Sequence, residues 1–130
     1  MTKIIWHNGK WVSDKAPVFT ISDRIRLGDG IFDTALIIDS RAQHLDKHFK
    51  RLEDNAEALN LKALFTFQEF ETLTLEIITQ NNAQTGRFAL NTFLSRGAVG
   101  RGLKTTEISS PQLLLKLSPV PETFPEIHAI

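Results

Sequence analysis

The stretch IFDTALII, residues 31–38, decides how this chain of 130 residues folds. It is rich in β-branched and aromatic residues, it follows Gly28-Asp29-Gly30, and it ends at the turn-forming pair Asp39-Ser40. This composition predicts a β-strand that is buried on both faces. The elements predicted on either side of the strand then determine the fold class.

Two amphipathic helices are predicted after this strand. The first runs from about Asp46 to Asn60, and its apolar residues recur at helical spacing: Leu45, Phe49, Leu52, Ala56 and Leu59. The second begins at Thr66, because Glu69 three residues later completes a capping box. Its predicted buried face contains Phe70, Leu73 and Ile77.

A hairpin and two further strands complete the predicted sheet. Asn8-Gly9 is a strong hairpin signal, because a type I′ turn needs positive φ at both central positions, and it joins strands at residues 3–6 and 10–12. Hydrophobic alternation predicts strands over Arg87–Ser95 and Gln112–Ser118, each with one well-packed face. Because these elements do not alternate as βαβ units, we expect an α+β fold, a mostly antiparallel sheet with two main helices packed on one face.

The length of the chain suits one domain with a core of its own. We expect this domain to span residues 1–119. Residues 120–130 are predicted to form an extended interdomain connector, because three prolines stand between positions 118 and 125. A second domain is expected beyond the connector.

Composition narrows the classes of partner. Fifteen basic and 15 acidic residues give a formal net charge of zero, so no overall field favours nucleic acid or an anionic membrane. The absence of cysteine excludes disulfides and zinc–thiolate sites, and it fits a reducing compartment. No apolar run in the sequence is long enough to span a bilayer. We therefore expect a cytoplasmic protein whose partner is a small molecule or another protein.

His48 and Arg51 form the first candidate site. Their spacing of three residues places them on neighbouring positions of one helix surface. An arginine fork can bind a phosphate through paired hydrogen bonds, and a nearby histidine can orient it or relay a proton. The alternative is a solvated helix edge shared with Lys47, Lys50 and Glu53, and spacing alone favours this alternative.

Two glycine-containing segments are the other candidates. Ser95–Gly102 leaves a predicted strand and carries Arg96 and Arg101, which could clamp a carboxylate; the alternative is a flexible surface turn. Asp23–Gly30 combines charges of both signs with two glycines. Its residues alone favour a structural turn that is held by an Asp–Arg pair.

Other chemistries find little support in the sequence. The four histidines are scattered and no HExxH motif or carboxylate cluster accompanies them, so no metal site is predicted. No serine lies in a GxSxG context, which argues against a serine hydrolase. Most of the nine phenylalanines fall at periodic core positions, so they are not interpreted as a stacking platform for bases.

The three candidate segments, in this order, resemble the class IV aminotransferase family. Residues 21–37, ISDRIRLGDGIFDTALI, resemble its turn and the aromatic–acidic pair that opens a strand. Residues 44–52 are similar to its HLxxHxxRL helix, and residues 95–102 to its SRG–GRG loop, most closely as found in aminodeoxychorismate lyases and related transaminases. The resemblance covers almost the whole chain. It implies the N-terminal domain of a fold-type IV enzyme, a class that uses pyridoxal 5′-phosphate.

The resemblance also implies roles for individual residues. Arg51 would bind the cofactor phosphate, with His48 and Asp33 as supporting groups near the cofactor. Arg101 would reach toward the substrate carboxylate, across a homodimer interface.

Two positions bear on the choice of substrate. Phe32, a substrate-binding position by resemblance, stands where D-amino-acid transaminases have tyrosine, and Leu103 stands where they have histidine. Both differences put D-amino-acid transamination in doubt. Lyase activity and other transaminase activities stay open.

No lysine in the chain matches the family's Schiff-base lysine, which the resemblance places in the second domain; the last lysine, Lys116, lies in a predicted core strand. We therefore expect no catalytic residue among these 130 residues and no activity from them alone. The first hypothesis is the N-terminal half of a pyridoxal-phosphate-dependent aminotransferase for a small amino acid, with elimination by an aminodeoxychorismate lyase as its alternative. The second hypothesis is a non-catalytic dimerisation or interaction domain of the same fold.

Overall fold

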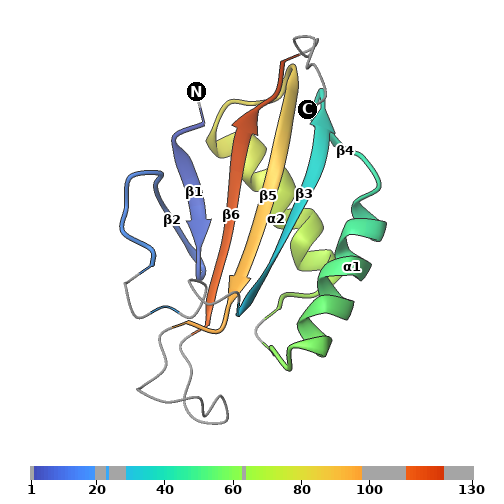
Figure 1. Cartoon of the computed structure of the whole chain (residues 1–130). Coiled ribbons are helices and arrows are strands. Elements are labelled where there is room, and N and C mark those ends of the chain that lie inside the picture. Colours follow the sequence, from blue (N-terminus) through green and yellow to red (C-terminus); the bar gives the residue numbers. More distant parts are fainter. Residues whose placement is uncertain (1, 20–22, 24–28, 63, 98–110, 122–130) are drawn as a thin grey trace, which may run out of the picture.

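A six-stranded sheet carries two helices on one of its faces (Figure 1). The computed structural model describes residues 2–19, 23, 29–62, 64–97 and 111–121. In chain order its elements are β1 (Ile4–His7), β2 (Lys10–Ser13), β3 (Gly30–Ile38), β4 (Arg41–Ala42), α1 (Leu45–Ala58), α2 (Phe67–Gln80), β5 (Arg87–Ser95) and β6 (Gln112–Pro119). The strand order is β2-β1-β6-β5-β3-β4, and every pairing is antiparallel. The predicted α+β fold is confirmed.

Local sequence signals explain the ends of several elements. The hairpin between β1 and β2 turns at Asn8 and Gly9, whose φ angles of 46° and 88° are the positive values that a type I′ turn requires. The predicted capping box starts α2: the Thr66 hydroxyl accepts a hydrogen bond from the Glu69 backbone, and the Glu69 carboxylate accepts one from the Thr66 backbone. Both predictions are confirmed.

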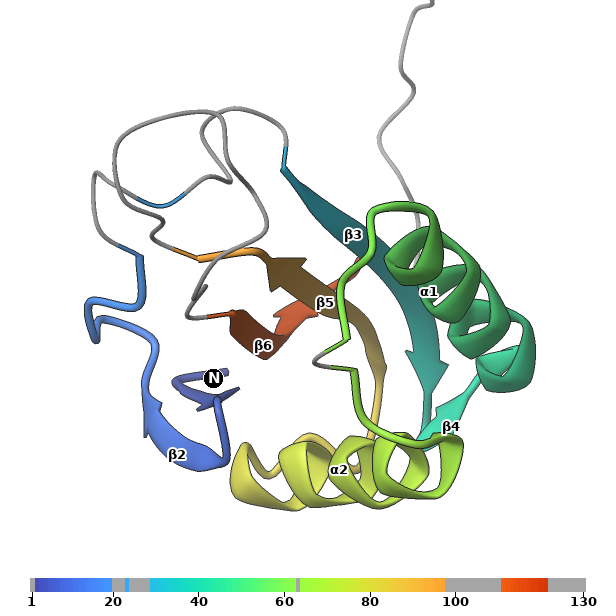
Figure 2. The ribbon, with the colours of Figure 1, turned by 90° about the horizontal axis from the view of Figure 1, so that it is seen from below.

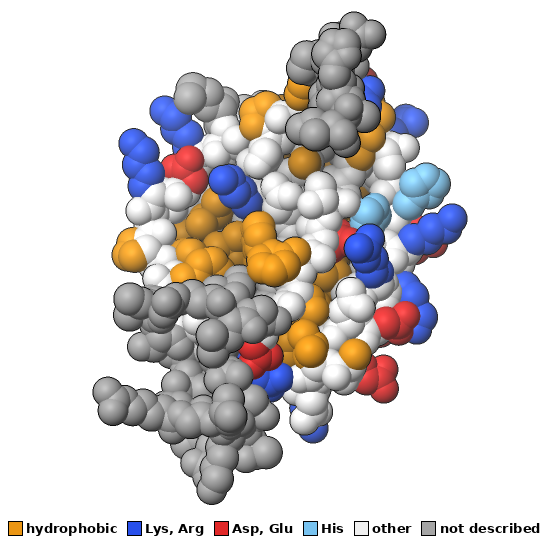
Figure 3. Space-filling view, in the orientation of Figure 1, with side chains coloured by type: hydrophobic (Ala, Val, Ile, Leu, Met, Phe, Trp, Pro, Cys, Tyr) orange, Lys and Arg blue, Asp and Glu red, His pale blue; other side chains and the backbone are white. Residues whose placement is uncertain are grey.

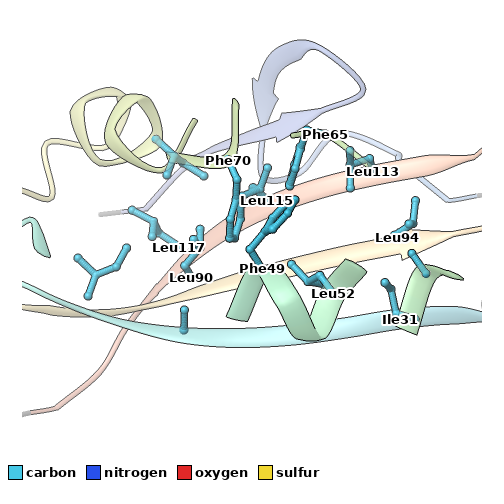
Figure 4. Packing of buried hydrophobic residues seen from close by; sticks show 14 of the residues in the cluster. Ile31, Phe49, Leu52, Phe65, Phe70, Leu90, Leu94, Leu113, Leu115 and Leu117 are labelled. Atoms are coloured by element: carbon cyan, nitrogen blue, oxygen red, sulfur yellow. The ribbon is translucent and has the colours of Figure 1, made fainter. Parts of the chain in front are cut away.

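The core lies between the helices and the sheet. Figure 2 shows α1 and α2 on the same side of the strands, and Figure 4 shows Phe49, Leu52 and Phe70 of the helices among leucines of β5 and β6. Three phenylalanines form its centre: the ring centroids of Phe65 and Phe70 lie 5.0 Å apart, and those of Phe49 and Phe70 lie 5.9 Å apart. Burying one such side chain contributes about 1.5–3 kcal/mol, so this cluster is a main source of stability.

The burial of β3 differs from the prediction. Its helix-facing residues are buried, namely Ile31, Asp33, Ala35 and Ile37, whereas Phe32 and Thr34 are exposed on the opposite face. The expectation of burial on both faces is wrong for this half of the strand, because both helices cover the same face. The sequence did not reveal the alternation of buried and exposed residues in β3, because Phe32 is aromatic but points away from the core.

Some predictions concern residues outside those described. Val120 and Pro121 are the described part of the predicted connector, and residues 122–130 lie outside it. Within the described residues, no helix is both long enough and apolar enough to cross a membrane.

Candidate functional site

Helix α1 runs beside β3, near the edge of the sheet (Figure 1). Strand β4 pairs only with Ile37 and Ile38, so among the described strands none covers the outer edge of β3 from residue 30 to residue 35. Four residues that the sequence singled out lie on these two elements: Phe32, Asp33, His48 and Arg51. We call this group the β3-edge site.

A short contact between an acid and a histidine joins β3 to α1 within the site. His48 Nδ1 lies 2.9 Å from Oδ2 and 3.0 Å from Oδ1 of Asp33. The Asp33 side chain is 1% exposed and that of His48 is 23% exposed. A carboxylate that leaves water needs a partner of this kind, since an unpaired buried charge is strongly unfavourable. The structure thus brings together the two residues that were expected to support the cofactor.

Sequence reasoning missed Thr92 as a member of this polar group. Thr92 is the cross-strand neighbour of Asp33 and is completely buried. Its hydroxyl makes no hydrogen bond within the described residues, and the same is true of Asp33 Oδ2, whose contact with His48 is electrostatic. Alternation over Arg87–Ser95 predicted one packed face for this strand, and Thr92 lies on that face with Leu90 and Leu94. Alternation could not show that an acid would lie opposite.

Arg51 occupies the solvent-facing side of α1. Its side chain is exposed, and within the described parts of the chain it has no hydrogen-bond or ion-pair partner. The neighbouring Lys50, by contrast, is held by Asp54 at 2.8 Å, and this hydrogen bond raises the pKa of Lys50. Figure 3 shows basic and histidine side chains gathered along the α1 side of the molecule. None of the described residues therefore occupies the guanidinium of Arg51.

Phe32 lies on the other face of β3. Successive side chains of a strand point to opposite faces, so Phe32 points away from Asp33 and α1. It is 52% exposed and packs edge-to-face on Phe93, with ring centroids 5.2 Å apart. Figure 3 shows this face, on which hydrophobic side chains gather over β1 and β6. A ligand that touches both Phe32 and Arg51 must therefore lie across the outer edge of β3, which none of the described strands covers from residue 30 to residue 35.

Arg96 has a structural role. Its Nε lies 2.8 Å from Asp29 Oδ2, its Nη2 donates to the Leu59 carbonyl oxygen, and the residue is buried. The carboxylate-clamp interpretation is not supported for Arg96, because these contacts occupy its guanidinium. An Asp–Arg pair was predicted to hold the turn over Asp23–Gly30. Asp29 of this turn does pair with an arginine, but that arginine is Arg96, which follows β5. Arg101 and Leu103 lie outside the described residues.

Gly30 is explained by the fold. A Cβ atom at this position would lie 2.8 Å from the backbone oxygen of Leu94 on β5. Only glycine allows the two strands to come this close, so its presence does not indicate a ligand.

The described lysines are all on the surface. Lys116 belongs to β6 as predicted, and its side chain is exposed on the face opposite the helices. All other described lysines are exposed as well. Among the described residues, no three His, Cys, Asp or Glu side chains cluster in a way that could hold a metal ion.

Comparison with known proteins gives one family and one fold. The family model described as amino-transferase class IV matches residues 30–129. A branched-chain amino acid aminotransferase from Escherichia coli is 19% identical, with a TM-score of 0.81, over 92% of this chain and 40% of its own. A hypothetical aminotransferase from Mycobacterium tuberculosis in a form with pyridoxal phosphate is 25% identical, with a TM-score of 0.71, over 91% and 40%.

A third solved structure is a putative 4-amino-4-deoxychorismate lyase from Legionella pneumophila. It is 26% identical, with a TM-score of 0.71, over 83% of this chain and 39% of its own. The chain thus spans about two fifths of the length of the structures it matches.

Proposed function

The chain belongs to the class IV amino-transferase family, and from this premise we propose that it contributes the phosphate contact of a pyridoxal-phosphate-dependent aminotransferase that acts on a small amino acid. The observation that carries the proposal is the exposed guanidinium of Arg51, which has no partner among the described residues and lies one helical turn from the His48 of the Asp33–His48 pair. A guanidinium binds phosphate oxygens through two parallel hydrogen bonds, so the side chain of Arg51 suits the phosphate of the cofactor.

Each residue of the β3-edge site has one task in this proposal. When bound, the cofactor supplies the electron sink for chemistry at the substrate's α-carbon. Arg51 holds the phosphate, and His48 and Asp33 are supporting groups near the cofactor. Phe32, together with Phe93, offers an apolar surface to the substrate on the other side of the strand edge. Arg101 is proposed to meet the substrate carboxylate.

The proposal places the Schiff-base lysine outside these 130 residues. Support comes from two observations: every described lysine is exposed, and the chain spans about two fifths of the matched structures. A lysine that works as a nucleophile is normally desolvated or placed next to another cation. The same proposal includes a homodimer in the cytoplasm, and it expects these residues alone to be inactive.

Elimination is the second candidate reaction. It is favoured by the similarity to the Legionella protein, a putative lyase, at 26% identity. The two reactions differ in their need for an amino acceptor. Activity of the whole protein that requires a keto acid would support transamination, whereas activity on an aminated acid without an acceptor would support the lyase.

Replacing Arg51 tests the phosphate contact in the whole protein. Arg51→Gln is expected to lose charge-assisted hydrogen bonds worth about 1.5–3 kcal/mol, which weakens binding of pyridoxal phosphate by roughly ten- to a hundredfold. Arg41→Gln is the matched control, because Arg41 is an exposed arginine of β4. Cofactor absorbance gives the affinities. An Arg51→Gln variant that binds like the wild type would remove the phosphate role, and the interaction-domain hypothesis would then gain support.

A further inference from the structure

Asp33 is the described residue whose position the proposed function leaves unexplained. It lies on the core face of β3, between the buried residues Ile31 and Ala35, and its side chain is almost completely buried. An apolar residue at this position would avoid the cost of removing a carboxylate from water. The presence of a carboxylate at position 33 therefore requires an explanation other than core packing.

His48 supplies the partner, and the contact is directional. Both carboxylate oxygens lie within 3.0 Å of Nδ1, so this nitrogen carries the hydrogen that Asp33 accepts. The ring of His48 is thereby fixed on the β3 side of α1. Its other nitrogen, Nε2, makes no hydrogen bond within the described residues.

The pair also restrains the helix that carries Arg51. Phe49 and Leu52 bury the adjacent side of α1, but apolar contacts have little directional preference, so they permit small rotations of a helix about its axis. The short, directional hydrogen bond from His48 to Asp33 joins α1 to β3 and resists such rotation. His48 and Arg51 are three residues apart and occupy neighbouring positions on the helix surface, so the restraint acts close to Arg51.

We propose that Asp33, acting through His48, is a positioning residue for Arg51: the pair sets the orientation of α1 from which the guanidinium meets the cofactor phosphate. This inference rests on the proposed function, in which Arg51 binds that phosphate. Asp33 itself touches neither cofactor nor substrate.

The sign of the effect separates positioning from a simple charge effect. Asp33 is negative, and so is phosphate. If Asp33 acted only through its charge, its removal would strengthen phosphate binding, and any neutral residue would have the same effect. If it acts by holding His48, its removal weakens phosphate binding, and a neutral residue that still accepts a hydrogen bond preserves it.

The test compares two variants of Asp33 in the whole protein. Asp33→Val removes both the charge and the acceptor, and it is expected to weaken binding of pyridoxal phosphate by about tenfold, by analogy with groups that orient metal ligands. Asp33→Asn keeps an acceptor for His48 Nδ1 and is expected to retain most of the affinity. Asp54→Asn removes an exposed acid three residues from Arg51 and serves as the charge control, with no loss expected.

Binding of pyridoxal, which lacks the phosphate, distinguishes positioning from general damage. It is expected to stay unchanged in Asp33→Val, whereas a variant with a disturbed fold would bind both ligands less well. If Asp33→Val fails to fold, the double variant Asp33→Val/His48→Leu replaces the ion pair with apolar side chains, a change that buried pairs often tolerate. The double variant is expected to show the same selective loss for pyridoxal phosphate.

Combining Asp33→Val with Arg51→Gln distinguishes a failure of the positioning role of Asp33 from a failure of the phosphate role of Arg51. When Arg51→Gln weakens cofactor binding, Asp33→Val is expected to add no further loss in its presence. Wild-type affinity in folded Asp33→Val or in the double variant, with Arg51→Gln impaired, would overturn the positioning role and leave the phosphate role intact. Wild-type affinity in Arg51→Gln would instead overturn the proposed function.

Discussion

Asn81 is expected to be one of the most sensitive polar residues in the fold. Its carboxamide makes three hydrogen bonds of 2.9 Å: the Ile4 backbone N–H donates to Oδ1, and Nδ2 donates to the carbonyl oxygens of Ile4 and Ile77. These bonds tie β1 to the end of α2. Each contributes about 1 kcal/mol net, so Asn81→Ala should lower the free energy of unfolding by about 3 kcal/mol.

Denaturant unfolding of the purified chain measures this loss. The matched control is Gln80→Ala, because Gln80 is the exposed residue that precedes Asn81, and it should change the free energy by less than about 0.5 kcal/mol. The slope of the free energy against denaturant should be equal in all three proteins if the native and unfolded states keep their exposed surfaces. A loss in Asn81→Ala below about 1 kcal/mol would refute the reasoning, because water would then replace the three bonds at little cost.

Two further substitutions test how the ends of β3 and β5 are held. Arg96→Ala removes the ion pair with Asp29 and the hydrogen bond to the Leu59 carbonyl oxygen, and the expected loss is about 3 kcal/mol in denaturant unfolding; a variant as stable as the wild type would contradict the structural role of Arg96. Gly30→Ala puts a methyl group 2.8 Å from the Leu94 carbonyl oxygen and should cost about 1–3 kcal/mol through overpacking. Thermal melting measures it, and an unchanged midpoint would contradict the close strand contact.

Local patterns made most of the fold predictable. Helical spacing gave α1, the Thr66–Glu69 pair gave the start of α2, and Asn8-Gly9 gave the first hairpin. In each case the physical cause lies within a few residues of the chain. The buried face of β3 was harder to predict. Phe32 is aromatic yet exposed, so its identity does not reveal which side of the sheet carries the helices.

Several contacts that hold the fold join residues far apart in the chain. Arg96 and Asp29 are separated by 67 positions, and Asn81 and Ile4 by 77. Such pairs leave no periodic trace, since each partner alone resembles an ordinary surface residue. Helical spacing singled out His48, whereas Asp33 could be named only by resemblance. Their direct contact follows from the packing of α1 on β3, which the sequence does not specify at the level of single atoms.

The most direct test of the central claim is a structure of the whole protein with pyridoxal phosphate bound. We expect the guanidinium of Arg51 to donate hydrogen bonds to phosphate oxygens at about 2.7–2.9 Å, with His48 still held by Asp33. A cofactor phosphate bound elsewhere, with Arg51 in solvent, would contradict the claim.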